Sequence, residues 1–259
     1  MSLGIVIPLK SKRVSDNWNL TSKLLDETLT SLRNQSLQNF KVIIVCHELP
    51  DISAENKNIA QFLQCDFELR SHKPGQEITH YKQIDYILDK NRKISYGLEA
   101  IQSRDIEYFM VLDADDLVHK DFVKYIMDTK DPNGYIVHLG YQYYTDLEKV
   151  VDRNDIDKIC GSSTVLHESL VPIPSKITDE SMTIIPWCFL CHSHMETHYS
   201  ETKRLLHEIP FPSVLYKLGH GQNASDEFRE GLLDYIKLKA KLLIKGKKAT
   251  VEIKSSFGI

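Results

Sequence analysis

Three carboxylates lie within four residues, at Asp113, Asp115 and Asp116, directly after the apolar run Tyr108–Leu112. Such a run is typical of a buried strand. Carboxylates this close repel one another unless a cation lies against them, and hard divalent ions prefer oxygen ligands. An aspartate at the end of a strand can also form a turn or cap a helix. The whole cluster favours metal or nucleotide binding over that structural role.

Strands and helices are expected to alternate before this cluster. Apolar runs predict strands over Leu3–Leu9, Phe40–Val45, Phe67–Arg70 and Tyr108–Leu112. Apolar residues at helical spacing predict two helices, Ser22–Asn34 with Leu25, Leu29 and Leu32 buried, and one from Tyr86 with Ile94, Leu98 and Ile101 buried. A further short helix is expected over Ile59–Leu63.

This alternation is typical of a parallel sheet with right-handed crossovers. We therefore predict an α/β fold with a Rossmann-like, mostly parallel sheet flanked by helices. Ligands of such sheets bind at the carboxyl ends of the strands. Pro8, Glu48 and the Asp113 cluster all lie at such ends, so we expect them to converge on one site.

Composition and charge narrow the class of protein. The net charge of -4 over 259 residues gives no overall attraction to nucleic acid. Five cysteines form an odd, unpatterned set, which predicts reduced thiols and a cytoplasmic location. The chain leads from Met1 straight into a strand, so we expect no signal peptide, and no apolar run approaches the roughly 18 residues that cross a membrane.

A diphosphate bound at this edge of the sheet would need cationic partners. Carboxylates alone repel its oxygens, so Asp115 is expected to act through a bridging Mg²⁺ or Mn²⁺. Arg92 or Lys93 would supply a direct cationic contact, although both could instead belong to a solvated helix face. When a bond between a sugar and a diphosphate breaks, a divalent ion stabilises the charge that develops on the leaving oxygen.

Five segments between residues 3 and 122 resemble, in order, the landmarks of the family 2 glycosyltransferases of the glycosyltransferase-A fold. These segments are Gly4–Leu9, Leu29–Ser36, Phe40–Val45, Lys93–Leu98 and Tyr108–Asp116. The resemblance implies an inverting transfer from a UDP-sugar donor.

The same resemblance implies roles for individual residues. Asp113, Ala114 and Asp115 match the family's Asp-x-Asp motif, in which the first acid faces the nucleotide ribose and the second binds the metal. Further residues that would contact the nucleotide are Pro8, Glu48 and Lys93. One departure is the segment Cys46–Glu48, where many relatives carry an Asp-Asp pair that contacts the base.

Two downstream segments also resemble parts of this family. Leu215–Ser225 is similar to a Tyr-Arg-x-His-x-x-Asn-x-Ser segment, with one residue added before the histidine. His220 is thereby a candidate metal ligand or diphosphate contact, and an imidazole suits Mn²⁺ better than Mg²⁺. A surface loop histidine is the alternative. Cys160–Thr164 resembles a small-residue turn near the donor sugar, and Gly134–Tyr144 is predicted to be a strand with aromatic faces.

An inverting transfer needs a base that accepts the proton of the acceptor hydroxyl. Family members usually place it in a Glu-Asp pair upstream of the Tyr-Arg segment, and this chain has Trp187–His198 in that window. Glu196 is therefore the first candidate for the catalytic base and His194 the second.

The same window offers a zinc site as an alternative. Its thiols and imidazoles belong to Cys188, Cys191, His192, His194 and His198. Thiolates and imidazoles at short spacing can bind zinc, but structural sites usually draw a second ligand pair from a separate element. Trp187–Leu190 also fits a buried strand that ends in a polar turn.

The chain is expected to divide into three parts. Residues 1–122 form a nucleotide-sugar-binding half, 123–225 an acceptor and catalytic half of the same domain, and 226–259 a C-terminal appendage. The appendage reads as a basic amphipathic helix over Glu227–Lys248 and a short strand over residues 249–254. Such a helix could lie on an anionic membrane or pack its apolar side on the domain.

Together these patterns predict a metal-dependent glycosyltransferase of glycan or polysaccharide synthesis, with a nucleotide-sugar donor and a glycan or lipid-linked acceptor. The altered Cys46–Glu48 segment and the missing Glu-Asp pair leave open a non-catalytic protein that binds a nucleotide or partner on the same fold. A nucleotidyltransferase should carry a glycine-rich basic loop after the first strand, whereas Lys10–Arg13 contains no glycine.

Overall fold

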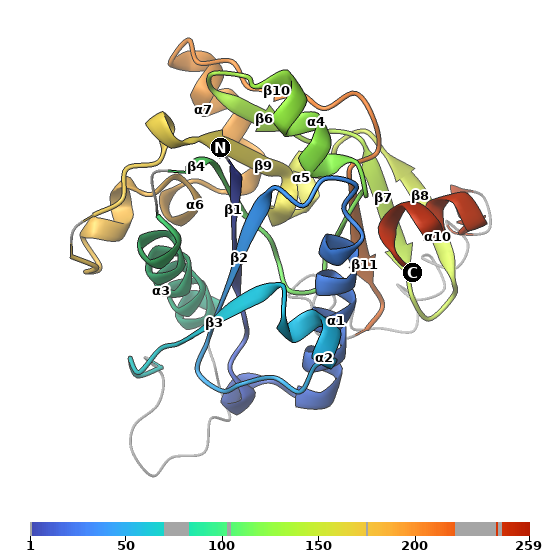
Figure 1. Ribbon diagram of the computed structural model, residues 1–259, viewed down its shortest axis with the longest axis horizontal. Helices are drawn as coiled ribbons and strands as arrows, with labels where there is room; N and C mark the ends of the chain where they lie inside the picture. The colour runs from blue at the N-terminus through green and yellow to red at the C-terminus, as the bar shows by residue number, and fades with distance from the viewer. Residues whose placement is uncertain (1, 70–82, 103–104, 175, 221–241, 243–244) are drawn as a thin grey trace.

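The computed structural model describes residues 2–69, 83–102, 105–174, 176–220, 242 and 245–259, and two sheets organise them (Figure 1). The strands of the first sheet, in spatial order, are β10 (His207–Glu208), β6 (Gly134–Ile136), β9 (Thr164–His167), β4 (Ile106–Val111), β1 (Ser2–Pro8), β2 (Phe40–Cys46) and β3 (Ala60–Gln64). Those of the second are β12 (Lys247–Lys248), β8 (Lys149–Arg153), β7 (Gly140–Tyr144), β11 (Val214–Leu218) and β5 (Leu117–Val118).

Helices pack on both faces of the first sheet (Figure 1). The α-helices are α1 (Trp18–Arg33), α2 (Ala54–Lys57), α3 (Gln83–Ile101), α4 (Phe122–Thr129), α5 (Ile156–Ile159), α6 (Pro186–Phe189), α7 (Met195–Glu201) and α10 (Val251–Phe257). The 3-10 turns are η1 (Lys12–Val14), η2 (Gly161–Ser163), η3 (Glu168–Leu170), η4 (Ser181–Ile184) and η5 (His192–His194). No helix in the described ranges combines the length and the apolar character that crossing a membrane requires.

The first sheet is parallel where the sequence predicted it to be. β1 lies between β2 and β4 and runs parallel to both, and β3 continues the parallel order beyond β2. β9 runs antiparallel to both of its neighbours, β4 and β6. The predicted α/β class with a mostly parallel central sheet is confirmed.

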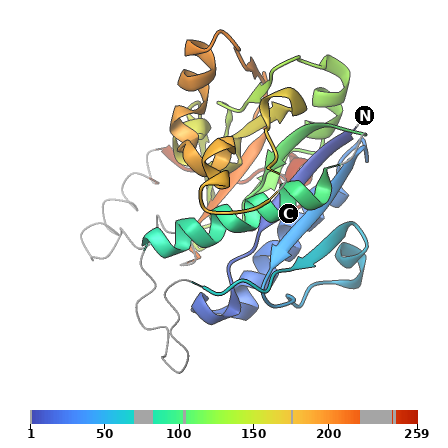
Figure 2. The same ribbon diagram turned by 90° about the vertical axis from the view of Figure 1, so that its left-hand side faces the viewer.

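Alternate residues of the central strands face different helices, as a pleated strand requires. Leu3, Ile5 and Ile7 of β1 share a core cluster with Leu25, Leu29 and Leu32 of α1. Val6 of β1 packs in a second cluster with Ile94, Leu98 and Ile101 of α3. Figure 2 shows α3 lying along this second face. The apolar stripes predicted for both helices are confirmed.

One core joins the parts of the chain before and after residue 122. The cluster that contains Leu3 and Leu25 also contains Ile126, Tyr135 and Val214. Both parts of the chain therefore pack around the same hydrophobic core.

Helix α1 begins four residues before the predicted start at Ser22. Asn17 caps it, since its side-chain oxygen accepts a hydrogen bond from the Leu20 amide at 3.0 Å. Thr21 and Ser22, polar residues at the predicted start that could also cap a helix, are instead buried within it. Several polar residues near a helix start can all serve as caps, and packing decided between them.

The predictions for residues 59–70 were wrong. The segment predicted as a short helix at Ile59–Leu63 is β3, an edge strand whose Ala60 pairs with Val42 of β2. The predicted strand at 67–70 is not formed over residues 67–69, and residue 70 lies outside the described residues. A short, half-buried edge strand shows no full period, so its pattern fits either structure.

The predicted single strand over Gly134–Tyr144 is two strands in different sheets. The chain leaves β6 at Val137, whose amide donates to the Ser163 carbonyl at 2.8 Å. It enters β7 at Gly140, where an added Cβ would lie 2.3 Å from the Val214 carbonyl oxygen. The predicted strand at Trp187–Leu190 is also wrong, since Pro186 begins the single helical turn α6 there.

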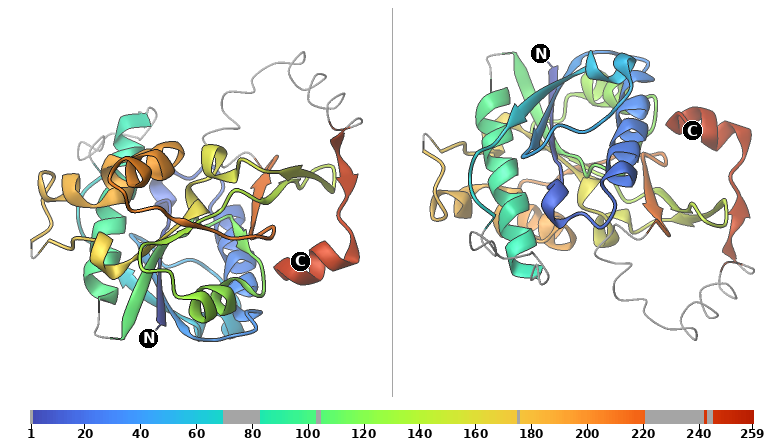
Figure 3. Two further views of the ribbon diagram at one scale, coloured as in Figure 1. Left: turned by 90° about the horizontal axis from the view of Figure 1, so that it is seen from above. Right: turned by 90° about the horizontal axis from the view of Figure 1, so that it is seen from below.

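Near the C-terminus the predicted strand over 249–254 is helix α10. Thr250 caps it by accepting from the Ile253 amide at 3.2 Å, and Gly258 ends it with a φ of 76°. Ile253 and Phe257, four residues apart, bury their side chains against the second sheet, beside which Figure 3 shows α10. Of the predicted helix over Glu227–Lys248, Lys247–Lys248 form strand β12, and most of the remainder lies outside the described residues.

Candidate functional site

A cavity of about 310 Å³ opens at the carboxyl ends of β1 and β4. This volume is at the lower end of the range of small-molecule sites, roughly 300 to 1,000 Å³. The apolar part of its wall consists of Pro8, Leu9, Leu24, Ala114 and Ile159. Its charged residues are Lys10, Asp89, Lys90, Lys93, Asp113 and Asp115. Of the residues predicted to converge at this sheet edge, Pro8, Asp113 and Asp115 line the cavity and Glu48 does not; Lys93, predicted to contact the nucleotide, also lines it.

Asp113 follows β4 directly and is paired with Lys90 of α3. The ammonium of Lys90 donates to the Asp113 carboxylate at 2.5 Å. Burial disfavours the Lys90 charge, but the Asp113 carboxylate outweighs that effect, so the pKa of Lys90 is raised. We did not assign Lys90 to the site from the sequence. Its spacing of three residues from Lys93, on the same helix face, was the available signal.

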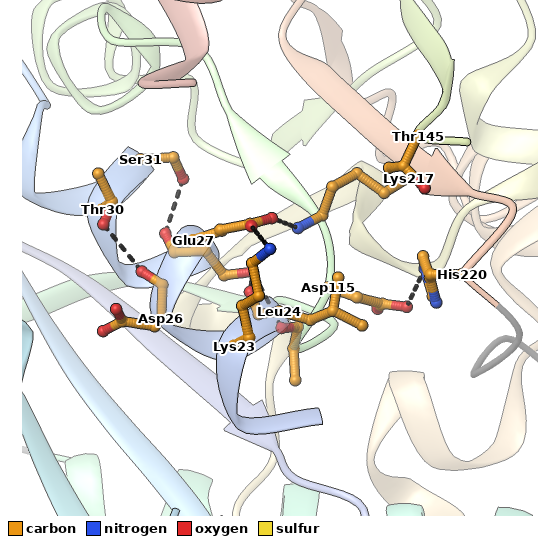
Figure 4. Close-up of polar contacts among 12 residues, drawn as sticks. Lys23, Leu24, Asp26, Glu27, Thr30, Ser31, Asp115, Thr145, Lys217 and His220 are labelled. Carbon is orange, nitrogen blue, oxygen red and sulfur yellow. Dashed lines mark hydrogen bonds and ion pairs between the residues drawn. The ribbon is translucent and has the colours of Figure 1, made fainter. Parts of the chain in front are cut away.

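Asp115 lines the cavity, and His220 lies beside Asp115 without lining the cavity itself (Figure 4). His220 Nε2 lies 3.4 Å from the Asp115 carboxylate. Two ligand atoms on one octahedral ion, each about 2.1 Å from it, lie roughly 3 Å apart when adjacent. The observed separation and the oxygen–imidazole donor pair therefore fit one shared ion, with Mn²⁺ favoured over Mg²⁺ by the imidazole.

The backbone of β11 is anchored next to His220. Lys217 of that strand is 1% exposed, and its ammonium donates to the Glu27 carboxylate of α1 at 2.8 Å. Figure 4 shows Lys217 directed toward Glu27, to which Lys23 also points. This pair ties β11 to α1 and so fixes where the segment toward His220 begins.

Asp116 belongs to the turn but not to the cavity. Its side chain is 0% exposed, and one of its oxygens accepts hydrogen bonds from the Ser162 hydroxyl at 2.6 Å and the Cys160 thiol at 3.0 Å. Burial, followed by the neighbouring Asp115 and Asp113 charges, raises the pKa of Asp116 well above its usual value. Ser162 also accepts from the Asp113 amide at 2.9 Å. Asp116 thus braces the backbone that carries the other two acids.

Lys93 and Arg92, both predicted to contact the donor, have different surroundings. Lys93 lines the cavity, but its buried ammonium donates to the Leu9 carbonyl at 2.8 Å and to Asp89 at 2.6 Å. Arg92 donates to Asp179 at 3.2 Å and lies over the Phe67 ring. Arg92 is therefore directed to a neighbouring loop and does not line the cavity.

The segment after β2 is turned to its own surroundings. The Glu48 carboxylate accepts from the Ser11 hydroxyl at 2.9 Å and from the Lys12 amide at 2.8 Å, which holds the loop after β1. His47 contacts the Phe67 carbonyl through Nε2 at 2.9 Å, and burial followed by the nearby Lys93 charge lowers the pKa of its imidazole. Neither side chain lines the cavity.

Glu196, the first candidate for the base, lies in the first turn of α7 and is 43% exposed on its side chain. Its carboxylate contacts His138 Nε2 at 3.2 Å and Lys158 at 3.6 Å. His192 connects this cluster to the cavity, since it lines the cavity wall and its Nε2 donates to the Lys158 carbonyl at 3.3 Å. His194, the second candidate, lies in η5 just before α7.

The two cysteines of the proposed zinc site have separate partners. The Cys188 thiol donates to the Asn91 carbonyl at 3.5 Å, and burial raises the pKa of this thiol to about 12. Cys191 is exposed and contacts the Ser193 hydroxyl at 3.3 Å. Within the part of the chain that the structure describes, the grouped metal-ligating side chains are His138, Asp157 and Glu196, and neither cysteine belongs to that group.

No protein-family model and no curated protein sequence matches this chain. Among solved structures, the chain is similar to the first 349 residues of S. aureus TarS, with 13% identity, a TM-score of 0.46 and coverage of 95% of this chain and 65% of that one. The complex of the same S. aureus segment with UDP has 13% identity, a TM-score of 0.44 and coverage of 84% and 61%. A 4-diphosphocytidyl-2C-methyl-D-erythritol synthase from Anaerococcus prevotii has 10% identity, a TM-score of 0.37 and coverage of 93% and 98%.

All three TM-scores are below 0.5, and the chain spans less than two thirds of the length of the TarS segment. The likeness therefore assigns no activity. What the site can do has to follow from its own residues.

Proposed function

We propose that the chain is a metal-dependent glycosyltransferase that takes its sugar from a nucleoside diphosphate. The observation that supports this most is the cavity at the carboxyl ends of β1 and β4, in which carboxylates and ammonium groups meet apolar walls. Apolar walls suit a nucleoside, and the charged end suits a diphosphate bound with a cation. Uridine is the base that the family resemblance implies.

Asp115 and His220 would hold the divalent ion, which would stabilise charge on the leaving diphosphate. Lys90 lies 2.5 Å from Asp113 and offers three N–H donors, so it can contact a phosphate oxygen without losing Asp113. Asp113 is then free to accept from a ribose hydroxyl with its second oxygen. Asp116, buried behind them, keeps the turn in place.

Glu196 is the proposed general base. The acceptor hydroxyl would lose its proton to Glu196 while its oxygen bonds to the sugar C1, and the bond from C1 to the diphosphate oxygen would break with its electron pair leaving on the diphosphate. The direction of attack, opposite to the leaving group, would invert C1. The acceptor would enter beside the His192 wall, where α5 and α7 meet.

The test incubates the chain with each of a panel of nucleotide sugars, with and without Mn²⁺. Water serves as the acceptor, and the nucleoside diphosphate released is measured. We expect one donor to be hydrolysed only with Mn²⁺, and Asp115→Asn to lower the rate by about 100-fold or more. Asp121→Asn is the matched control, because Asp121 bonds to Ser36 outside the cavity. Release of no diphosphate by the unsubstituted chain, or an unchanged rate in Asp115→Asn, contradicts the proposal.

The second function is nucleotide binding without transfer. His47 and Glu48 favour it, because both are engaged within the protein and do not line the cavity. This alternative predicts that UDP with Mn²⁺ stabilises the fold while every nucleotide sugar in the panel stays intact.

A further inference from the structure

The imidazole of His138 lies between two carboxylates. Its Nε2 is 3.2 Å from Glu196, and its Nδ1 is 3.4 Å from Glu208. Each ring nitrogen thus has its own carboxylate partner, and the two contacts together hold the ring in one orientation.

The backbone fixes this ring from two directions. Strand β10 runs parallel to β6 with Glu208 opposite Ile136, so Glu208 lies beside the point where the chain leaves β6 toward His138. The His138 carbonyl accepts from the Ile156 amide at 3.0 Å, which ties it to the start of α5. Rotation of the ring would break both carboxylate contacts.

Charged groups from every neighbouring element face this pair. Helix α5 contributes Asp157, 3.9 Å from the His138 ring and 2% exposed, and Lys158, whose ammonium lies 2.7 Å from Asp157. The two oxygens of Glu196 have different partners, since Oε1 faces His138 and Oε2 faces Lys158. A carboxylate whose two oxygens contact two different side chains is held in one orientation.

His138 is the less exposed of these two partners of Glu196. Its side chain is 20% exposed, against 44% for Lys158. Contacts of an exposed lysine contribute little to orientation, because solvent screens them and the side chain must be ordered. The orientation of Glu196 therefore depends mainly on the imidazole.

We propose that His138 is a positioning residue for the transfer reaction, which holds the Glu196 carboxylate in one orientation toward the acceptor hydroxyl. This inference rests on the proposed function, in which Glu196 accepts the acceptor proton. His138 does not touch the reacting atoms. It acts as the third group of a nucleophile, base and orienting-group arrangement, with Glu208 fixing its far nitrogen.

The test compares His138→Gln and His138→Ala with the unsubstituted chain in Mn²⁺-supported hydrolysis of the nucleotide sugar identified by the panel. Outer partners of a functional group typically contribute 10-fold to 100-fold, so we expect kcat to fall by about that factor in His138→Gln while KM for the donor changes less than about twofold. Free imidazole should restore part of the activity of His138→Ala.

His207→Gln is the matched control. His207 precedes Glu208 in β10 and contacts Tyr125 and Asp131 instead of Glu196, so its loss should leave kcat unchanged. Thermal stabilisation by UDP with Mn²⁺ should be the same in His138→Gln as in the unsubstituted chain, which shows that the donor site is intact.

Three results would overturn the inference. Unchanged kcat in His138→Gln, with only a lower melting temperature, would make the cluster a structural contact between β6, α5, α7 and β10. The cluster would be a metal site if Asp115→Asn still bound Mn²⁺ or Zn²⁺ and the further change His138→Gln abolished that binding. If the unsubstituted chain releases no diphosphate, the proposed function fails and the role of His138 fails with it. If the unsubstituted chain is active and His138→Gln has the same rate, the inference alone fails.

Discussion

Replacing Lys90 by methionine tests whether this lysine is the cation that compensates the acidic turn. The Lys90 ammonium lies 2.5 Å from Asp113, and its pKa is raised because Asp113 outweighs the effect of burial. A raised lysine pKa contributes stability below the unfolded value, near 10.4, and that contribution is lost as pH rises through the folded value. At pH 7 the contribution is therefore fully present, and Lys90→Met removes it.

The size of the effect follows from distance and exposure. Opposite charges about 4 Å apart near a protein surface attract by roughly 4 kcal/mol at an effective dielectric constant of 20. Both side chains are partly exposed, 32% for Lys90 and 27% for Asp113, and fully exposed pairs contribute only about 0 to 1 kcal/mol. We therefore expect a coupling of about 1 to 2 kcal/mol, or roughly 2 to 8 °C in melting temperature for a domain of this size.

A double-mutant cycle at pH 7 measures this coupling by thermal unfolding of the unsubstituted chain, Lys90→Met, Asp113→Asn and the double variant. Lys90→Met should cost little once Asp113 is already Asn. Lys124→Met, in the exposed pair with Asp128, is the control and should change stability by less than about 0.5 kcal/mol. A Lys90–Asp113 coupling below about 0.3 kcal/mol would refute the reasoning.

Three further predictions follow from contacts in and behind the cavity. Gly161→Ala would place a Cβ 2.8 Å from the Asp113 carboxylate, so affinity for UDP with Mn²⁺, measured by calorimetry, should fall about tenfold, or 1.4 kcal/mol, and an unchanged affinity would contradict this. Gly97→Ala would place a Cβ 2.3 Å from Val6, so denaturant unfolding should show a loss of about 1 to 3 kcal/mol, where an uncrowded helix would gain about 1 kcal/mol. Burial, followed by the neighbouring acids, raises the pKa of Asp116. The unfolded chain therefore loses this proton near pH 4 while the folded chain keeps it, so the wild type loses stability as pH rises. The melting temperature of Asp116→Asn relative to wild type should therefore increase from pH 4 toward pH 8, and a flat difference would count against a raised pKa.

The elements of the central sheet could be predicted where one face of a helix or both faces of a strand are buried. Leu25, Leu29 and Leu32 repeat at helical spacing because a single sheet covers them. Segments at the edge carry no such pattern. Ile59–Leu63 was mistaken for a helix because β3 is paired on one side only. The start of α10 was mistaken for a strand because the Ile253–Phe257 spacing is too short to show a period.

The acidic end of β4 could be located from the sequence because strand ends of a parallel sheet meet at one edge. The lysine and arginine side chains around this acidic end could not be placed from the sequence to the same extent. Lys90 and Lys93 share one face of α3, whereas Arg92 is two residues from Lys90 and so points the other way, a difference that helical geometry supplies. His138 was missed because its carboxylate partners lie 58 and 70 residues farther along the chain, and only the pairing of β10 with β6 brings Glu208 beside it.

The central claim is that Asp115, together with His220, binds a divalent ion that fixes a nucleoside diphosphate in the cavity. Thermal unfolding with UDP, measured with and without Mn²⁺ for the unsubstituted chain and for Asp115→Asn, tests it most directly. At 100 times the dissociation constant a ligand stabilises the native state by about 2.7 kcal/mol, which corresponds to roughly 5 to 11 °C here. We predict that rise only for the unsubstituted chain with both UDP and Mn²⁺ present, and an equal rise without Mn²⁺ or in Asp115→Asn would contradict the account.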